Sequence, residues 1–463
     1  MKFDSILIKN SSLVVTMDDN KNKIPGGEIL IQDREIKAVG KNISKKSKFN
    51  KKKCKIIDAT DCIVIPGFIN THHHLYQTFN RAIPSVQNAE LFDWLKNLYE
   101  IWKKITPEWV YLSCKLGLAE LALTGCTTTL DQFYIFPKNQ PKNLMDYLIQ
   151  SANEIGLRFH ACRGAMSRGR SKGGLPPDEL VQDEDEILSD YERVINKFHN
   201  PERFSMCQIV LAPCSPFSVT TELLKETLNL ARKKGVFCHT HLAETKDEEK
   251  YCLEKYNKRP VQYIESVGWL GEDISFAHCV HLNKEEIELL GKNKVGVAHC
   301  PTSNLRLGSG IAPVRELINA GAKVGLAVDG SSSNDSSDML AEVRQALFVS
   351  RYKSGVNSMT AEDVLWLATR GGAEVLGRSD IGSIEPGKSA DIAIFNLSQI
   401  GYTGGSIYDP VGSLVFCGDS HIAETVIING RVVVDKGKLT TVDQEKLIFE
   451  SNKYMKKLLG GLN

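Results

Sequence analysis

The feature that most constrains the fold of this chain is a series of eight short apolar runs in its middle part, roughly residues 65 to 375. In order, the runs are "CIVIPGFIN", "GCTTTLDQF", "GLRFHACRG", "FSMCQIVLAP", "GVFCHTHLAE", "ISFAHCV", "KVGVAHCP" and "KVGLAVDG". Segments with helical periodicity, such as "TTELLKETLNLARKKG", lie between them and end at glycine, as helices often do. Eight successive β-α units predict a (β/α)8 barrel, in which the C-terminal ends of all the strands meet at one site.

The two ends of the chain have a different pattern. Apolar and polar residues alternate in "SILIKNSSLVVTM" and "GEILIQDREIKAVG", which predicts short antiparallel strands. The pattern returns in "ETVIINGRVVVDKGKL", where Asn429-Gly430 indicates a tight hairpin. We therefore expect an α/β protein in three parts. They are a small β-sandwich domain built from residues 1–65 and 376–440, a TIM-like barrel of residues 66–375, and a packing helix within residues 441–463.

Composition excludes several classes of protein. The formal net charge of +1 creates no field that would favour nucleic acid or a membrane surface. There is no run of 18 apolar residues, and Asp4 interrupts the apolar stretch near the N-terminus, so we expect neither a membrane span nor a signal peptide. The 12 cysteines are dispersed and form no CxxC motif, which indicates a reduced protein of the cytoplasm.

Three adjacent histidines follow the first apolar run, in "PGFINTHHHL". On a strand, residues two apart share a face, so His72 and His74 can bind one metal ion while His73 points away. His241 in the fifth run and Asp329 in the eighth lie at strand ends that converge on the same place. We predict that His72, His74, His241 and Asp329 hold one divalent cation, since Zn²⁺ accepts such nitrogen and oxygen ligands.

Two further residues at strand ends complete the predicted site. Glu244 follows His241 by three residues, and His278 ends the sixth run. The other histidines are expected to be structural or to lie on the surface: His73, His160, His199, His281 and His299. A second match to the fifth-strand motif, "HIAE" at residues 421–424, lies in the late β-rich segment and is interpreted as structural.

The motifs "PGFINTHHH", "HTHLAE", "HCPTSNLRLGSG" and "AVDGSSSNDSSDM", in this order, resemble those of the amidohydrolase superfamily, and within it the deaminases of purine, pyrimidine and triazine rings. "GSIEPGKSADIAIF" resembles the family's return to the small β-domain. The resemblance extends over essentially the full length. It implies a hydrolase that acts on C–N bonds of cyclic amidines and that assembles as a homo-oligomer.

The resemblance also implies the number of metal ions. Two-metal members of the family carry a carboxylated lysine or a glutamate on the fourth strand, and "FSMCQIVLAPCSPF" contains neither. A single ion is expected, Zn²⁺ before Fe²⁺. By the same resemblance Asp329 takes a proton from the attacking water, Glu244 protonates a ring nitrogen, and His278 hydrogen-bonds to the attacking oxygen.

The expected substrate is a small heterocyclic base. "HHHLYQTFNRAIPSVQNAELFDWLKNLY" and the segment around the long loop at residues 167–186 resemble the branch that contains 8-oxoguanine deaminase. Conversion of 8-oxoguanine to urate is therefore the first expectation. The alternatives are deamination of isocytosine or guanine, and an aminohydrolase or chlorohydrolase of hydroxyatrazine-type triazines.

Four residues are candidates for binding this base. Gln77 is placed to hydrogen-bond a ring carbonyl or N–H. Cys214 stands where adenosine-type relatives carry histidine, which argues against a ribosylated substrate. Trp94 either stacks on the base or packs in the core of a helix. Arg163 either lines the pocket or forms a salt bridge with the acidic loop that follows it.

Two competing interpretations are weaker. Another deaminase class holds zinc with H-x-E and P-C-x-x-C motifs, but Phe217 stands where the second cysteine would be needed after Pro213-Cys214. A non-enzymatic assembly protein that has lost its ligands is also disfavoured, because all six residues of the predicted metal and catalytic set are present.

Overall fold

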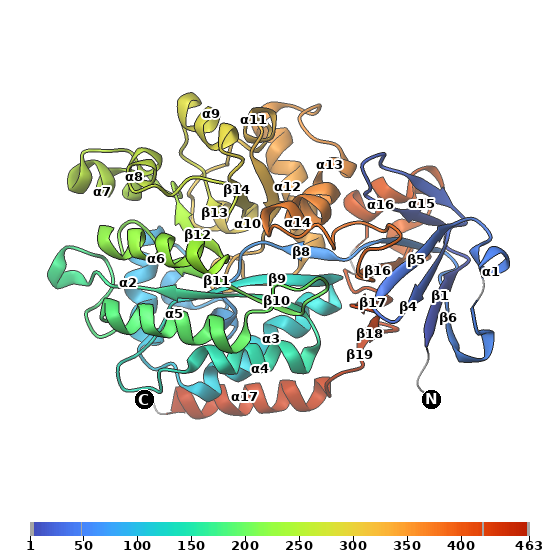
Figure 1. Ribbon diagram of the computed structural model, residues 1–463, viewed down its shortest axis with the longest axis horizontal. Coiled ribbons are helices and arrows are strands. Elements are labelled where there is room, and N and C mark those ends of the chain that lie inside the picture. Colours follow the sequence, from blue (N-terminus) through green and yellow to red (C-terminus); the bar gives the residue numbers. More distant parts are fainter. Residues whose placement is uncertain (1–3, 48, 419–420, 461–463) are drawn as a thin grey trace.

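The eight apolar runs form the barrel that the sequence predicts. The structure is a computed structural model that describes residues 4–47, 49–418 and 421–460, and Figure 1 shows its arrangement. Eight parallel strands lie in chain order from β8 to β15, each hydrogen-bonded to the next. Their bounds are β8 Phe68–Asn70, β9 Cys126–Phe133, β10 Arg158–Ala165, β11 Cys207–Pro213, β12 Phe237–Leu242, β13 Ile274–His278, β14 Gly296–His299 and β15 Lys323–Leu326.

Hydrogen bonds between the first and last strands close the ring. The backbone N–H of Thr71 donates to the carbonyl of Leu326 at 3.1 Å, and the N–H of Asp329 donates to the carbonyl of His72 at 3.1 Å. The segment that follows β8 therefore lies directly beside the segment that follows β15. Two predicted metal ligands, far apart in the chain, are held together by the backbone itself.

Helices surround the barrel and connect its strands (Figure 1). They are α2 Leu91–Trp102, α3 Pro107–Leu123, α4 Leu144–Ile155, α5 Glu184–Phe198, α6 Thr221–Lys234, α7 Lys246–Tyr256, α8 Pro260–Ser266, α9 Lys284–Lys292, α10 Pro301–Arg306, α11 Val314–Ala320, α12 Met339–Ser354, α13 Ala361–Trp366 and α14 Gly372–Val375. Helix α6 shows the expected ends, because Thr220 accepts the N–H of Leu223 and Gly235 adopts a left-handed conformation after the last turn. No helix in the described ranges has the length and hydropathy to cross a bilayer.

The chain ends supply the strands of two smaller sheets. One has the order β5-β4-β1-β6 and the other the order β19-β18-β17-β16-β7-β2-β3. The bounds are β1 Ser5–Lys9, β2 Leu13–Val15, β3 Lys23–Pro25, β4 Glu28–Gln32, β5 Glu35–Gly40, β6 Cys54–Asp58, β7 Cys62–Pro66, β16 Ile392–Asn396, β17 Thr425–Ile428, β18 Arg431–Asp435 and β19 Lys438–Leu439. An apolar cluster that includes Ile8, Val64 and Ile392 draws on both sheets, so the expected β-sandwich is confirmed.

The pairing within these sheets is only partly antiparallel. β7 and β16, from opposite ends of the chain, pair antiparallel, and Asn429-Gly430 makes the hairpin between β17 and β18 with φ values of 51° and 77°. However, β1 pairs with β6 and β2 pairs with β7 in parallel. The prediction of purely antiparallel strands is wrong for these two pairs, because alternation reports which face is buried and not the direction of the neighbouring strand.

The last helix, α17 Gln444–Gly460, returns along the outside of the barrel (Figure 1). The hydroxyl group of Tyr454 lies 2.8 Å from that of Thr106, the residue that caps α3, and its ring stacks on Phe79. The remaining described helices are α1 Ile43–Lys46, α15 Gly405–Tyr408 and α16 Pro410–Phe416.

Candidate metal centre and active site

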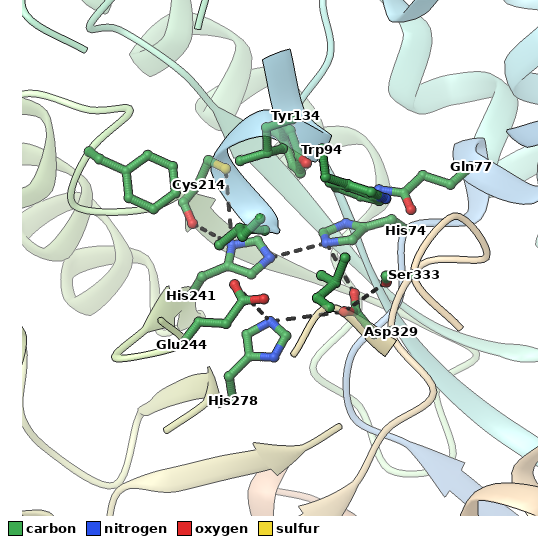
Figure 2. A pocket seen from close by; sticks show the side chains of 14 residues that line it. His74, Gln77, Trp94, Tyr134, Cys214, His241, Glu244, His278, Asp329 and Ser333 are labelled. Carbon is green, nitrogen blue, oxygen red and sulfur yellow. Dashed lines mark hydrogen bonds and ion pairs between the residues drawn. The ribbon is translucent and has the colours of Figure 1, made fainter. Parts of the chain in front are cut away.

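The strand ends bring the predicted ligands into one buried cluster. Figure 2 shows His74, His241, His278, Glu244 and Asp329 around a common space. The Nε2 atom of His74 lies 3.1 Å from Nε2 of His241 and 3.5 Å from Oδ1 of Asp329. The Nε2 atom of His72 lies 3.3 Å from the same carboxylate oxygen. Two overlapping sets have ligand atoms within 4.8 Å of one another: His72, His241 and His278, and His72, His74 and Asp329.

Hydrogen bonds on the far side of each imidazole fix its tautomer. Nδ1 of His74 lies 2.7 Å from the carbonyl oxygen of Gln132, and Nδ1 of His241 lies 2.6 Å from that of Cys214. Each Nδ1 must therefore carry the hydrogen and donate it. In a neutral ring the Nε2 atom is then left with a bare lone pair, as in metal-bound histidines.

These lone pairs point at one another. Burial lowers the pKa of His74 and of His241, which keeps both rings neutral. Two bare nitrogens at 3.1 Å repel each other unless a cation lies between them. Among the described residues, the buried Nε2 atom of His72 has no partner other than the Asp329 carboxylate oxygen 3.3 Å away. The donor set, three imidazole nitrogens and one carboxylate, fits a divalent ion such as Zn²⁺.

A second layer of side chains holds these groups in place. Nδ1 of His72 lies 2.8 Å from Nε2 of His239, whose own Nδ1 lies 2.8 Å from the hydroxyl group of Ser275. On the other side of the site, Asp329 accepts hydrogen bonds from Ser303 at 2.6 Å and from Ser333 at 3.2 Å, both through Oδ2.

Three backbone positions at the site adopt the left-handed conformation that side chains disfavour. The φ angles are 53° at Ala243, 74° at His278 and 63° at Asp329. Each such position costs on the order of 1–3 kcal/mol and persists only where surrounding contacts enforce it. The local geometry is therefore imposed by the fold at the ends of β12, β13 and β15.

The acidic and basic groups at the site have shifted pKa values. Burial, with the negative charges of Asp329 and Glu248, raises the pKa of Glu244 to about 7. Burial alone would lower the pKa of His278, but the carboxylates of Glu244 and Asp329 raise it above its usual value. Burial would raise the pKa of Asp329, yet the adjacent histidines hold it well below its usual range. Near pH 7 Asp329 is therefore ionised, whereas Glu244 is still partly protonated.

A cavity with about 390 Å³ of empty space opens beside the cluster. Figure 2 shows Glu244 and His278 on one side of it and Trp94, Tyr134 and Gln77 on the other. Its lining residues are His74, Gln77, Leu91, Trp94, Leu95, Tyr134, Cys214, Phe217, His241, Glu244, His278, Leu307, Asp329 and Ser333. Three of the four candidates for substrate binding, Gln77, Trp94 and Cys214, therefore line the cavity.

Trp94 fits both interpretations, since it lines the cavity and also packs against the core. Its ring faces the cavity on one side and lies edge-on to Trp102 at 5.7 Å on the other. Its Nε1 donates to the carbonyl of Ser332 at 3.2 Å, which fixes the ring plane. Gln77 accepts the N–H of the same residue, Ser332, at 3.2 Å. Its amide nitrogen donates to the hydroxyl group of Tyr76 at 3.4 Å and has a second hydrogen for another acceptor.

Arg163 is not brought to the cavity. It is fully buried on β10, where Nε donates to Asp190 of α5 at 2.7 Å and the guanidinium group stacks 3.8 Å from the Phe136 ring centroid. The prediction that Arg163 binds substrate is therefore wrong. The alternative, a salt bridge, is right in kind, but its partner Asp190 lies in α5, beyond the loop at residues 167–186.

The remaining histidines make contacts of their own, except that the buried Nδ1 of His299 has no hydrogen-bond partner among the described residues. Nε2 of His73 lies 3.0 Å from the hydroxyl group of Ser337. His160 contacts Arg378, His199 accepts the N–H of Ile209, and His281 donates to the carbonyl of Ser309. His421 of the late HIAE motif pairs with Asp338.

Several residues that shape the cavity were not predicted from the sequence. Tyr134 directly follows the last residue of β9, so its place at a strand end was a usable signal. Its ring lies edge-on to His74, with centroids 5.2 Å apart. Leu91, Phe217 and Leu307 have no comparable signal, because an apolar residue beside a cavity looks like any core residue in the sequence.

A parallel barrel with histidines and an aspartate at its strand ends is the architecture of a metal-dependent hydrolase. The chain belongs to the Amidohydrolase family, which it matches over residues 63–433. It is 46% identical to the 8-oxoguanine deaminase of Pseudomonas aeruginosa over 404 residues, which cover 87% of this chain and 89% of that protein.

Two other relatives are more distant. The hydroxydechloroatrazine ethylaminohydrolase of a Pseudomonas species is 31% identical, with 97% of this chain and 94% of that protein covered. Among solved structures, the atrazine chlorohydrolase TrzN from Arthrobacter aurescens, complexed with zinc, is 33% identical with a TM-score of 0.92, and 97% of this chain and 100% of that chain are covered. The family resemblance noted in the sequence is thereby confirmed.

Proposed function

We propose that this protein is a metal-dependent deaminase that hydrolyses an amino-substituted purine or pyrimidine base, with 8-oxoguanine as substrate and urate as product. The observation that carries the proposal is the convergence of imidazole nitrogens and the Asp329 carboxylate on one buried centre, with Glu244 and His278 beside it at the cavity. The 46% identity to a deaminase of 8-oxoguanine supports the choice of substrate.

The ion would be held by His72, His74, His241 and Asp329. Zn²⁺ is the first candidate and Fe²⁺ the second, since nitrogen and carboxylate ligands suit both. When bound, such an ion polarises a water molecule and lowers its pKa toward neutrality. Glu244 and His278 are then free to act on protons and on the substrate.

The proton transfers follow from the pKa values. Asp329 is unprotonated and takes a proton from the water that attacks the ring carbon bearing the amino group. Glu244, protonated up to about pH 7, gives its proton to the adjacent ring nitrogen as the carbon becomes tetrahedral. Asp329 then passes its proton to the amino group, the C–N bond breaks and ammonia leaves. The remaining hydroxyl proton of the tetrahedral carbon returns to Glu244 as the ring carbonyl forms, which restores the acid.

His278 is placed to orient the attacking oxygen. Its Nδ1 lies 2.8 Å from Oδ1 of Asn304, so this nitrogen donates to the amide oxygen. The carboxylates of Glu244 and Asp329 raise the pKa of His278, which favours a hydrogen on Nε2 as well. That nitrogen lies 3.5 Å from Glu244 and 4.0 Å from Asp329, between the two groups that transfer protons.

The cavity walls suit a flat, uncharged ring. Leu91, Trp94, Leu95, Phe217 and Leu307 provide apolar surface, and few polar groups remain to fix orientation. Burial raises the pKa of Cys214 to about 12, so its side chain is a neutral thiol. The amide nitrogen of Gln77 is available for a ring carbonyl.

Parallel assays of ammonia release from 8-oxoguanine, guanine, isocytosine and hydroxyatrazine test this function. The expected result is the highest kcat/KM for 8-oxoguanine, with formation of urate and one equivalent of divalent metal per chain. The similarity to TrzN favours a triazine hydrolase as the second candidate. Release of an alkylamine or chloride, with no ammonia from any base, would establish that second candidate instead.

We also propose that the protein is a homo-oligomer. Tyr352 of α12 and Ile407 and Tyr408 of α15 are 87%, 85% and 93% exposed. These two helices both contact α16, so the exposed apolar side chains belong to one region of the surface. Such a region is typical of an interface. Sedimentation analysis of the protein and of Tyr408→Ser is the test, and a monomeric parent protein would refute the proposal.

The proposed compartment is the cytoplasm. All 12 cysteines are free thiols, and ten of them are buried. A chain with so many unpaired thiols suits a reducing environment. Fractionation of cells that express a tagged full-length chain would test this, with recovery outside the cytoplasm as the contrary result.

A further inference from the structure

Two neighbouring hollows lie at the C-terminal end of the barrel, and they differ in character. The inner one is the cavity at the metal cluster, with about 390 Å³ of empty space. The outer one has about 530 Å³ of empty space. The outer hollow is lined by Glu90, Leu91, Thr245, Lys246, Asp247, His281, Leu307, Gly308 and Ser309.

Of the described residues, Leu91 and Leu307 alone line both hollows. Leu91 is the first residue of α2, and Leu307 follows the last residue of α10. Their exposed fractions are 6% and 4%, although each borders a hollow that is open to solvent. The two leucines therefore form an apolar partition between a polar outer hollow and the reacting centre.

This partition limits which bases the inner cavity accommodates. With the amino-bearing ring carbon placed at the metal cluster, a large substituent on the opposite side of the ring would need space beyond the inner cavity. The outer hollow offers that space behind Leu91 and Leu307. Both side chains would then have to move out of positions in which they are almost completely buried.

We propose that Leu91 and Leu307 are specificity-determining residues that restrict this enzyme to free bases and exclude their nucleosides. The inference rests on the proposed function as a base deaminase. The outer hollow is lined by Glu90, Asp247 and Ser309, whose side chains can hydrogen-bond sugar hydroxyl groups. It would receive the sugar once the leucines are shortened.

The test compares the variants Leu91→Ala, Leu307→Ala and the double variant with Leu95→Ala. Leu95 lies one turn further along α2, is equally buried, and lines the inner cavity but not the outer hollow. For each protein, kcat/KM is measured with 8-oxoguanine and with 8-oxoguanosine. We expect the kcat/KM for 8-oxoguanosine, divided by that for 8-oxoguanine, to rise about tenfold or more in the double variant. This is the scale of steric discrimination in an apolar pocket. Leu95→Ala should affect both substrates alike.

A second measurement separates this inference from the proposed function. The rate at which 1,10-phenanthroline extracts zinc from the loaded protein reports access to the centre without any substrate. If the parent protein turns over no base, the proposed deaminase function is refuted. If zinc is nevertheless extracted faster from the double variant, the partition formed by Leu91 and Leu307 is supported. An unchanged nucleoside ratio and an unchanged extraction rate in variants that fold, as judged by circular dichroism, would overturn the inference. If the double variant does not fold, the same two measurements are made on Leu91→Ala and Leu307→Ala.

Discussion

The buried carboxylate of Glu248 accepts the backbone N–H of Glu244 at 2.8 Å, and its other oxygen accepts the N–H of Ala243 at 3.0 Å. Ala243 is one of the positions with a left-handed backbone. Glu248 lies in the first turn of α7, so it links that helix to the turn that presents Glu244. It is therefore a positioning residue for the proposed proton donor.

The variant Glu248→Gln tests this role. The glutamine amide replaces one of the two accepting oxygens with a donor that faces a backbone N–H. We expect kcat to fall about 10–100-fold while the metal content stays at one equivalent, since such supporting contacts typically have effects of this size. Glu254→Gln, at an exposed position of the same helix, is the matched control. Equal activity in both variants would show that Glu248 does not position Glu244.

Removal of the acid itself should have a larger effect. In Glu244→Gln the side chain keeps its shape but has no proton to give to the ring nitrogen. Loss of one general acid typically costs about 10²–10⁴-fold in rate, so kcat should fall by that amount. Metal analysis should still show one equivalent, because Glu244 is not among the proposed ligands. A variant that loses both metal and activity would place Glu244 among the ligands instead.

The pKa of Glu244 also predicts the pH dependence of the reaction. The pKa is raised to about 7, chiefly by burial, so the carboxyl group is protonated below that pH and loses its proton above it. Only the protonated form donates. The value of kcat/KM should therefore fall about tenfold for each pH unit above about 7. The residual activity of Glu244→Gln should not show this fall at high pH. If the fall persists in the variant, the ionisation that causes it belongs to another group.

Removal of the metal should destabilise the protein as well as inactivate it. An ion that binds the folded state and not the unfolded chain raises stability by mass action. Dialysis against 1,10-phenanthroline should lower the melting temperature, and added Zn²⁺ should restore both melting temperature and activity. His74→Ala should hold less than one equivalent of metal. His199→Ala, at a position away from the cluster, should keep its metal, and equal metal contents in the two variants would exclude His74 as a ligand.

Much of the site could be predicted from the sequence because of how a parallel barrel is built. His72, His74, His241 and Asp329 are rare residue types within or just after apolar runs, and the barrel brings the ends of those runs together. The predicted set therefore depends only on the recognition of strands and their order. The same argument gives Glu244 and His278.

The features that escaped prediction depend on information that a single sequence lacks. Arg163 lies near a strand end, but its neighbour Cys162 belongs to the apolar cluster inside the barrel, so Arg163 faces the helices and meets Asp190. A shift of one residue reverses the face, and the sequence does not reveal the register. Leu91 and Leu307 escaped for another reason, since their position between two hollows is a property of tertiary packing.

A last prediction concerns Asp131, which lies on β9 beneath the metal-binding segment. Its Oδ1 accepts the N–H of Leu75, the residue after His74, at 2.6 Å. Its Oδ2 has no partner among the described residues. Burial raises the pKa of Asp131 to about 8, so the folded protein binds this proton more tightly than the unfolded chain does. The associated stability is fully present below about pH 4 and is lost as the pH rises toward 8.

Asp131→Asn keeps an oxygen for Leu75 and cannot ionise. The variant should therefore melt at a higher temperature than the parent protein at pH 8, and the difference should shrink at pH 5, as measured by calorimetry at both pH values. Asp93→Asn, which removes an exposed carboxyl group from α2, should follow the parent protein throughout. A difference in melting temperature that is the same at pH 5 and pH 8 would mean that Asp131 is ionised in the folded protein. The segment after β8 would then be held by a buried charge and not by a neutral acid.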